Sequence, residues 1–225
     1  MNRNDVSVLS RSGESALATN KVLRNTYMLL GLTFLFSSFT AYASFAANTR
    51  PMNPLFFIAG IYGLMILTNA LKNSVWVLLS VFAFTGFLGY SLGPILNLYI
   101  HGFSNGTQIV TTALGGTGLI FFALSAYVLT TRKDFSYMGG FLFVGVMLAF
   151  LAMIANFFFQ IPALSLGISA AFVLISSGLI LFQTSEIIHG GETNYISATV
   201  SLFVSIYNLF LSLLQLLGAF AGNRD

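Results

Sequence analysis

The sequence predicts an all-α integral membrane protein, a seven-transmembrane-helix bundle with a cytoplasmic N-terminus and a periplasmic C-terminus. Of its 225 residues, 56% are hydrophobic and 7% are charged, whereas a soluble domain carries about 25% charged residues. The mean hydropathy is +0.87. A bilayer accounts for these values together, because hydrocarbon tolerates apolar surface on every side of a helix and penalises charge.

Seven apolar stretches are long enough to cross the hydrocarbon layer, which takes about 20 residues of helix. The connections between them are short and polar, such as "NTRPMN" (48–53) and "HGGET" (189–193), so consecutive spans should be antiparallel neighbours in one bundle. The predicted spans are Thr26–Ala47, Pro54–Leu71, Ser74–Leu98, Gln108–Leu129, Met138–Phe159, Ala163–Thr184 and Tyr195–Phe220.

The bundle should occupy residues 21–220, between a cytoplasmic tail of residues 1–20 and a short external tail of residues 221–225. The first twenty residues have few large apolar side chains, so we expect this tail to be flexible. Asn20 is a suitable N-cap for a first helix that begins at Lys21.

The orientation follows from the distribution of lysine and arginine, which favour the cytoplasmic side. With the N-terminus inside, seven basic residues are cytoplasmic and two are not, and an odd number of spans places the C-terminus outside. The cytoplasmic set is Arg3, Arg11, Lys21, Arg24, Lys72, Arg132 and Lys133, and the external set is Arg50 and Arg224.

Glycines mark the expected contacts between helices. Gly86, Gly89 and Gly93 recur at intervals of three and four and line one face of the third span, and three glycines crowd positions 115–118 of the fourth. Small residues let helix backbones approach closely in lipid, so both groups predict helix–helix seams. Pro94 should kink the third helix or end its regular hydrogen bonding.

The last span carries a polar stripe, which predicts that this helix turns one side toward protein or water and its Leu, Phe, Val and Ile side toward lipid. Such small polar residues also serve as simple packing contacts between helices, and this alternative stays open. The stripe comprises Asn194, Ser197, Ser201, Ser205, Asn208, Ser212 and Gln215.

Motifs for catalysis and metal binding are weak. "GYSLG" (89–93) matches the nucleophile-elbow pattern, but it lies within an apolar helix and has no nearby base. Glu186 and His189 are one helical turn apart, which is too few ligands for zinc or calcium. Cysteine is absent and no basic patch accompanies exposed aromatics, so we expect no catalytic residue, metal, cofactor or nucleic-acid partner.

Several long stretches are similar to a known family. "NKVLRNTYMLLGLT" (20–33), "FAFTGFLGYSLGPILN" (82–97), "SAYVLTTRKDFSYMGG" (125–140) and "LFQTSEIIHGGETNYISATVSLFVSIYNLF" (181–210) resemble the Bax inhibitor-1 (transmembrane Bax-inhibitor-motif) family. The resemblance to its bacterial branch implies an inner-membrane protein that binds the FtsH protease complex and restrains proteolysis. The wider family implies a pH-sensitive calcium leak, sensed by a pair of carboxylates on the last two helices.

The same resemblance places the sensor pair at Gln183 and Ser205, neither of which ionises. A shared proton between two carboxylates is what makes such a pair titrate near neutral pH, so the sensor should be weakened or absent here. Glu186 lies on a neighbouring part of the same helix face and is a candidate substitute ligand. The cytoplasmic loop that follows holds His189 and Glu192, with the glycines at 190–191 ending helix six.

The sequence therefore predicts a non-enzymatic inner-membrane modulator of the FtsH complex that acts by binding. The alternative is a calcium or cation leak, with calcium ions or protons as further partners, and a plain membrane scaffold is the third possibility. In the alternative, a polar pathway would run past Glu186, Ser201, Asn208 and Ser212.

Overall fold

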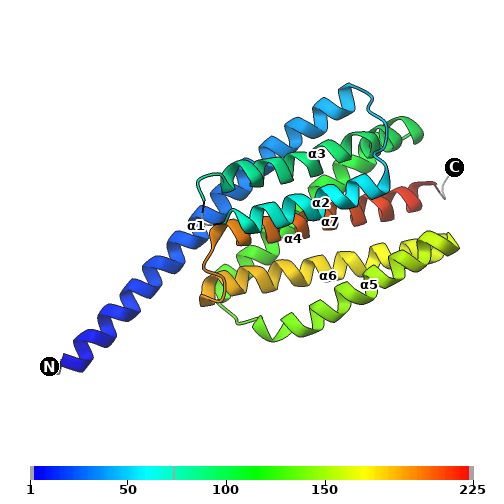
Figure 1. The fold of residues 1–225 in the computed structure, drawn as a ribbon. Coiled ribbons are helices and arrows are strands. Elements are labelled where there is room, and N and C mark those ends of the chain that lie inside the picture. Colours follow the sequence, from blue (N-terminus) through cyan, green and yellow to red (C-terminus); the bar gives the residue numbers. More distant parts are fainter. Residues whose placement is uncertain (1–2, 73, 223–225) are drawn as a thin grey trace.

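The computed structural model describes residues 3–72 and 74–222, and this part of the chain is helical without β-strands. Seven α-helices and one short 3₁₀ turn follow one another (Figure 1). They are α1 (Arg3–Ala46), α2 (Pro54–Ala70), α3 (Val77–Gly102), α4 (Gly106–Thr131), η1 (Ser136–Met138), α5 (Gly139–Phe159), α6 (Pro162–His189) and α7 (Tyr195–Gly222).

Six of these helices are long and apolar enough to cross a membrane. The exception is α2, whose 17 residues extend over about 26 Å at 1.5 Å per residue. This length is at the lower limit for a span of the roughly 30 Å hydrocarbon layer. The all-helical class and the order of the helices are confirmed, while α2 as a seventh span stays a prediction.

Residues outside the regular helix conformation mark several helix ends. Asn53 caps α2 by accepting a hydrogen bond from the Leu55 N–H at 2.9 Å, and Pro54 occupies the first helical position. Gly190 ends α6 with a φ of +78°, and the Gly191 and Glu192 N–H groups return to the Glu186 carbonyl. The predicted glycine stop of helix six is therefore confirmed.

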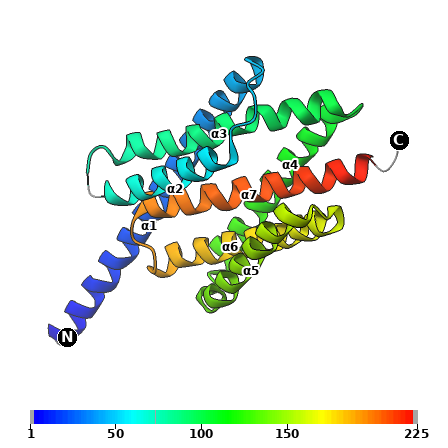
Figure 2. The same ribbon diagram turned by 45° about the vertical axis from the view of Figure 1, so that its right-hand side comes forward.

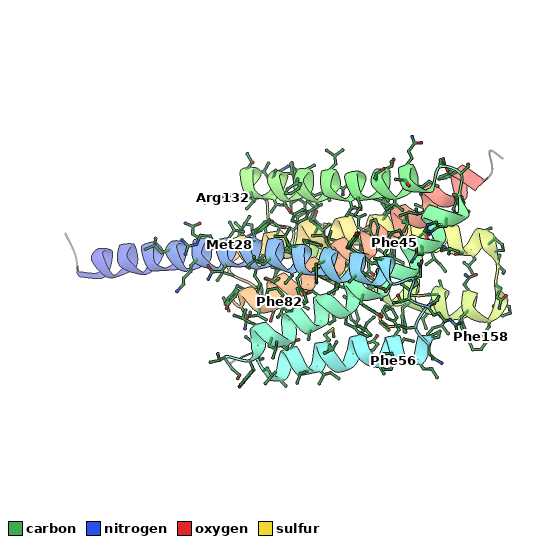
Figure 3. The ribbon with its side chains drawn as sticks, turned by 90° about the horizontal axis from the view of Figure 1, so that it is seen from above. Met28, Phe45, Phe56, Phe82, Arg132 and Phe158 are labelled. Carbon is green, nitrogen blue, oxygen red and sulfur yellow. The ribbon has the colours of Figure 1, made fainter. Side chains whose placement is uncertain are left out.

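The first helix differs from the prediction, because α1 is continuous from Arg3 and does not begin at Lys21. Asn20 consequently lies inside the helix and caps nothing. Figure 3 shows the first part of α1 projecting beyond the other helices. The flexibility of residues 1–20 stays a prediction, and residues 223–225 of the external tail lie outside the described part of the chain.

Consecutive helices run antiparallel, so the helix ends gather at two opposite ends of the bundle (Figures 1 and 2). The start of α1 and the α2–α3, α4–α5 and α6–α7 connections lie at one end, and the end of α7 lies at the other. The basic connection residues Lys72, Arg132 and Lys133 are therefore at the end from which α1 projects. That this end is cytoplasmic stays a prediction from the charge asymmetry.

Helix α7 lies at the centre of the bundle and packs against α1, α3, α4 and α6. The prediction that its apolar side faces lipid is wrong: Leu202, Phe203 and Leu209 are at most 1% exposed. They belong to a hydrophobic cluster that includes residues of α1, α3, α4 and α6, and Phe203 stacks on Phe34 of α1 at 4.9 Å between ring centroids. A helix surrounded by others buries both of its sides, whatever their polarity.

The glycines of α3 form the predicted seam, and they form it with α1. A Cβ atom built on Gly89 would lie 2.3 Å from the Ser37 carbonyl oxygen, and one on Gly93 would collide with Ser44 and the Phe45 backbone. In the fourth span the prediction holds only at Gly116, where a Cβ would lie 3.6 Å from Leu213 of α7, and it is wrong at Gly115 and Gly118, which have no atom within 4 Å of such a Cβ. Pro94 lies inside α3 without ending it.

Two helices are outlying elements of the bundle, namely α2, which packs on α3, and α5. Helix α5 packs on α6 and on η1, and most of its large apolar side chains are exposed. A cavity of about 520 Å³ separates parts of α5 and α6, with Gly145, Ala149 and Ala171 in its walls. The core thus consists of α1, α3, α4, α6 and α7, with α2 added on α3 and α5 on the outside of α6.

Candidate functional site

The two positions that the family resemblance assigns to the sensor pair meet between α6 and α7. The Ser205 hydroxyl donates to Gln183 Oε1 at 3.1 Å and also lies 3.0 Å from the Ser201 carbonyl oxygen. Ser205 is 2% exposed, and Gln183 is half-buried. The contact is a neutral hydrogen bond between helices, and neither partner has a charge that changes with pH.

The other members of the polar stripe on α7 have unequal surroundings. Ser212 is buried and Asn208 is half-buried, but Ser201 is exposed. The inward orientation predicted for the whole stripe is therefore wrong at Ser201. Ser201, Ser205 and Ser212 do not line the α5–α6 cavity, a cavity of about 530 Å³ between α1, α3, α4 and α7, or a cavity of about 520 Å³ beside the α1–α2 connection.

A second polar contact between α6 and α7 lies nearer the other end of the bundle. The Ser169 hydroxyl donates to Gln215 Oε1 at 2.7 Å, and Gln215 Nε2 donates to the Ser165 hydroxyl. The sequence placed Gln215 on the stripe but gave no sign of its partners, because Ser165 and Ser169 lie about fifty residues earlier. The stripe thus serves in part as a packing face, with two amide–hydroxyl contacts fixing α6 to α7.

Glu186, the candidate substitute ligand, is engaged by the α4–α5 connection. Its Oε1 accepts a hydrogen bond from the Ser136 hydroxyl at 2.6 Å. A Cβ on Gly191 would collide with the Glu186 carboxylate, so the glycine after the helix end makes room for it. Glu186 therefore joins the end of α6 to η1 and does not face Gln183 or Ser205.

His189, in the last turn of α6, also contacts the α4–α5 connection. Its Nε2 lies 3.1 Å from the Arg132 carbonyl oxygen, and its Nδ1 lies 2.9 Å from the Ser185 carbonyl oxygen. The Ser185 hydroxyl also accepts from the Phe135 N–H at 2.9 Å. Arg132 itself has a left-handed backbone with a φ of +51°, which ends α4 and turns the chain toward α6.

The pKa values of two charged groups in this connection, Asp134 and Lys133, are shifted. The hydrogen bonds from the Ser136 side chain and backbone hold the pKa of Asp134 below its ordinary value, and the nearby His189 acts in the same direction. The hydrogen bond and the Coulomb attraction of Tyr127 raise the pKa of Lys133. Glu192 accepts from the Asn194 N–H at 2.7 Å, just before α7 begins. These contacts order a helix end and a turn.

The structure shows the surroundings of the nucleophile-elbow serine and of the candidate metal ligands. Ser91, the serine of "GYSLG", donates to the Leu88 carbonyl at 2.6 Å and bonds the Tyr207 hydroxyl at 2.9 Å, and neither partner is a base. Within the described residues, no three His, Cys, Asp or Glu side chains gather as a metal site requires. The Ser91–Tyr207 pair was not predicted, since the two residues are 116 positions apart.

Comparisons with known proteins give this geometry a context. A sequence model of the family described as "Inhibitor of apoptosis-promoting Bax1" matches residues 19–222. The chain is 56% identical over 209 residues to the "Modulator of FtsH protease YccA" of Escherichia coli K12, covering 93% of this chain and 94% of that protein. A second E. coli strain carries an equally similar "Inner membrane protein YccA". An uncharacterized protein of Pseudomonas aeruginosa is 55% identical, over 90% of both chains.

Proposed function

The chain belongs to the Bax inhibitor-1 family as a multi-pass protein of the inner membrane, and from this premise we propose that it modulates the FtsH protease by binding to it. One observation carries the proposal, namely the 56% identity to a modulator of FtsH over 93% of this chain. The similarity covers almost the entire length of both proteins. The names of family and relative indicate a regulatory membrane protein.

The mechanism that we propose is competition with membrane substrates. A membrane protease must pull helices out of the bilayer, and it does so most readily where local unfolding is cheap. The α1–α3 seam favours resistance to extraction, because Gly89 and Gly93 bring the two backbones into direct contact. While the bundle occupies the protease complex, other membrane substrates would be degraded more slowly.

The projecting start of α1 supports the same proposal. It precedes the first apolar span, Thr19–Ala46, and extends past the connections at that end of the bundle (Figure 3). In the orientation predicted from the charges, this segment is on the cytoplasmic side. It is therefore a candidate for the part of the chain that the protease complex contacts first.

Co-purification tests the binding step. The tagged full-length chain, expressed at a low level in bacteria and extracted with a mild detergent, should bring FtsH with it. An equally tagged and equally abundant multi-pass protein of another family serves as the control. If both recover the same amount of the protease, the proposed function is wrong.

The cation leak lacks a specific observation in its favour. The pair at Gln183 and Ser205 is neutral, and these residues line none of the three cavities. We expect calcium flux through liposomes containing the chain to stay at the level of empty liposomes between pH 6 and pH 8. A flux above that level would make the leak the better account of this protein.

A further inference from the structure

A cavity of about 520 Å³ lies at the end of the bundle opposite to the projecting start of α1. It is enclosed by the α1–α2 connection, the first turn of α2, the second half of α3 and the middle of α7. Figure 3 shows Phe45, near the end of α1, and Phe56, near the start of α2, toward this end of the molecule. The cavity is separate from the Gln183–Ser205 contact and from the α4–α5 connection.

The walls of this cavity are polar and charged on the α1–α2 connection and mostly apolar on the helices. Arg50 lines it from the α1–α2 connection, whereas Phe57, Ile95 and Leu211 line it from the helices. Ser91 and Tyr207 also belong to its wall, and their hydroxyl groups are bonded to each other at 2.9 Å. Asn97 donates its Nδ2–H to the Phe45 carbonyl oxygen at 3.0 Å, but its buried Oδ1 has no hydrogen-bond partner. The helical walls therefore present mostly hydrocarbon, with one paired set of hydroxyls and one amide oxygen left to accept a hydrogen bond.

Arg50 has no anionic partner at its end of the bundle in the part of the chain that the structure describes. The acidic residues whose side chains are described are Asp134, Glu186 and Glu192, and all three belong to the α4–α5 or α6–α7 region at the opposite end. A guanidinium presents a planar set of donors that matches the oxygens of a phosphate group. Arg50 is exposed and has no acidic partner among the described residues, so its guanidinium is available to an anion.

The cavity also has a side facing the bilayer. Leu98, which lines it from α3, is 67% exposed. This leucine lies within a span long enough to cross the membrane, so its exposed surface meets lipid. A hydrocarbon chain can enter past Leu98 without crossing water.

We propose that this cavity binds one anionic phospholipid of the surrounding bilayer. Its phosphate pairs with Arg50, and one acyl chain passes Leu98 and lies against Phe57 and Leu211, ending near Tyr207. A free phosphate ion would leave the apolar walls uncovered. A lipid with a zwitterionic headgroup would bring a positive charge close to Arg50, so an anionic lipid is preferred.

Lipid retention measured by native mass spectrometry tests the proposal on the full chain in detergent. Dioleoyl-phosphatidylglycerol is the probe, with dioleoyl-phosphatidylcholine and inorganic phosphate in parallel samples. The wild type should retain one phosphatidylglycerol and less phosphatidylcholine. Arg50→Gln should lower the bound phosphatidylglycerol about fivefold, the size of one cation's attraction to an anionic lipid surface. Lys72→Gln, an exposed cation at the opposite end, should change nothing.

A second pair of variants tests the hydrocarbon part. Leu98→Trp should narrow the mouth and reduce retention without changing the charge, and the matched Leu119→Trp on the exposed face of α4 should not. Equal retention of both lipids by the wild type would overturn the proposal. So would equal losses in Arg50→Gln and Lys72→Gln, or equal losses in the two tryptophan variants. Retention of inorganic phosphate without retention of phosphatidylglycerol would mean an anion site and not a lipid site.

Discussion

The α1–α3 and α5–α6 interfaces use the same small residues with opposite results. On α3, a Cβ at Gly89 would lie 2.3 Å from a backbone oxygen of α1, so only glycine allows the two helices to be this close. On α5, a Cβ at Gly145 would meet the Ile175 side chain at an ordinary 3.5 Å, and a cavity opens beside it. At Gly89 the neighbour is backbone, which cannot turn aside, whereas at Gly145 there is room for a methyl group.

The difference divides the bundle into a fixed part and an outlying part. In the fixed part, α7 is surrounded by α1, α3, α4 and α6, while α5 has only α6 and η1 as neighbours. Hydrocarbon surrounds the lipid-facing side chains of α5 before and after unfolding within the membrane, so losing one costs little. A buried side chain on α7, such as Phe203, is packed by protein atoms, and its loss leaves a void.

The largest expected effect is a loss of unfolding free energy that differs between a side chain of α7 and one of α5. Phe203→Ala on α7 removes a ring that is 1% exposed and stacked on Phe34, and should lower the free energy of unfolding by about 3 kcal/mol. Phe143→Ala on α5, where the ring is 67% exposed, should change it by less than about 0.5 kcal/mol. Unfolding followed by circular dichroism in mixed micelles measures both, and equal losses would remove the distinction.

A pair of alanine substitutions tests the seam itself. Both Gly89→Ala and Gly115→Ala gain the same helix propensity, so the difference between them isolates the contact with α1. The added methyl group meets the Ser37 carbonyl at position 89 and no neighbouring helix at position 115. We expect Gly89→Ala to be less stable than Gly115→Ala by about 2 kcal/mol, the typical cost of overpacking. A stability of Gly89→Ala equal to that of Gly115→Ala would contradict the seam.

A double variant with two titratable side chains tests the contact between Gln183 of α6 and Ser205 of α7. In the double variant Gln183→Glu with Ser205→Asp, two carboxyl groups would replace a neutral hydrogen bond, and their proximity should raise the folded pKa of the pair above its unfolded value. A raised folded pKa means that stability is present at low pH and is lost as the pH rises through that pKa.

The double variant should therefore be less stable at pH 8 than at pH 4 by on the order of 1 kcal/mol, the equivalent of about one pKa unit. The wild-type pair should contribute no such difference, because neither residue titrates. Thermal unfolding at the two pH values, compared between the two proteins, gives the measurement. A pH-independent double variant would show that the two positions do not meet.

The smallest expected effect concerns the connection that leads into α5. The pKa of Asp134 is lowered, so its contribution to stability is present above the unfolded pKa of about 4 and is lost as the pH falls through the lower folded pKa. Ser136→Ala removes the hydroxyl group whose hydrogen bond is the largest cause of the lowered pKa, so it should move the titration midpoint of Asp134 upward. Carbon-13 NMR of labelled aspartate follows this midpoint, and Ser104→Ala, in another connection, is the control.

Much of the fold could be predicted from apolar run lengths, because the bilayer fixes how long a span must be. The start of α7 at Tyr195 and the end of α5 at Phe159 match the predicted bounds, and Gly190 ended α6 as expected. The start of α1 was missed, because the helix continues through the polar residues before the first span. The length of an apolar run carries no signal for a polar helix outside the membrane.

The candidate site was predictable only in part. The family resemblance brought Gln183 and Ser205 together, and they form a hydrogen bond. The partners of Tyr207 and Gln215 were missed, since hydroxyls on distant helices leave no pattern in the sequence. The lipid-facing side predicted for α7 was wrong, because the number of helices around a span determines its burial as much as its own polarity does.

The rate at which purified FtsH degrades a membrane substrate in proteoliposomes, with and without this chain, tests the proposed modulation most directly. The account predicts that degradation slows as the ratio of chain to protease rises, while most of the chain stays intact. A substrate degraded at the same rate at every ratio, with the chain present and folded, would contradict it.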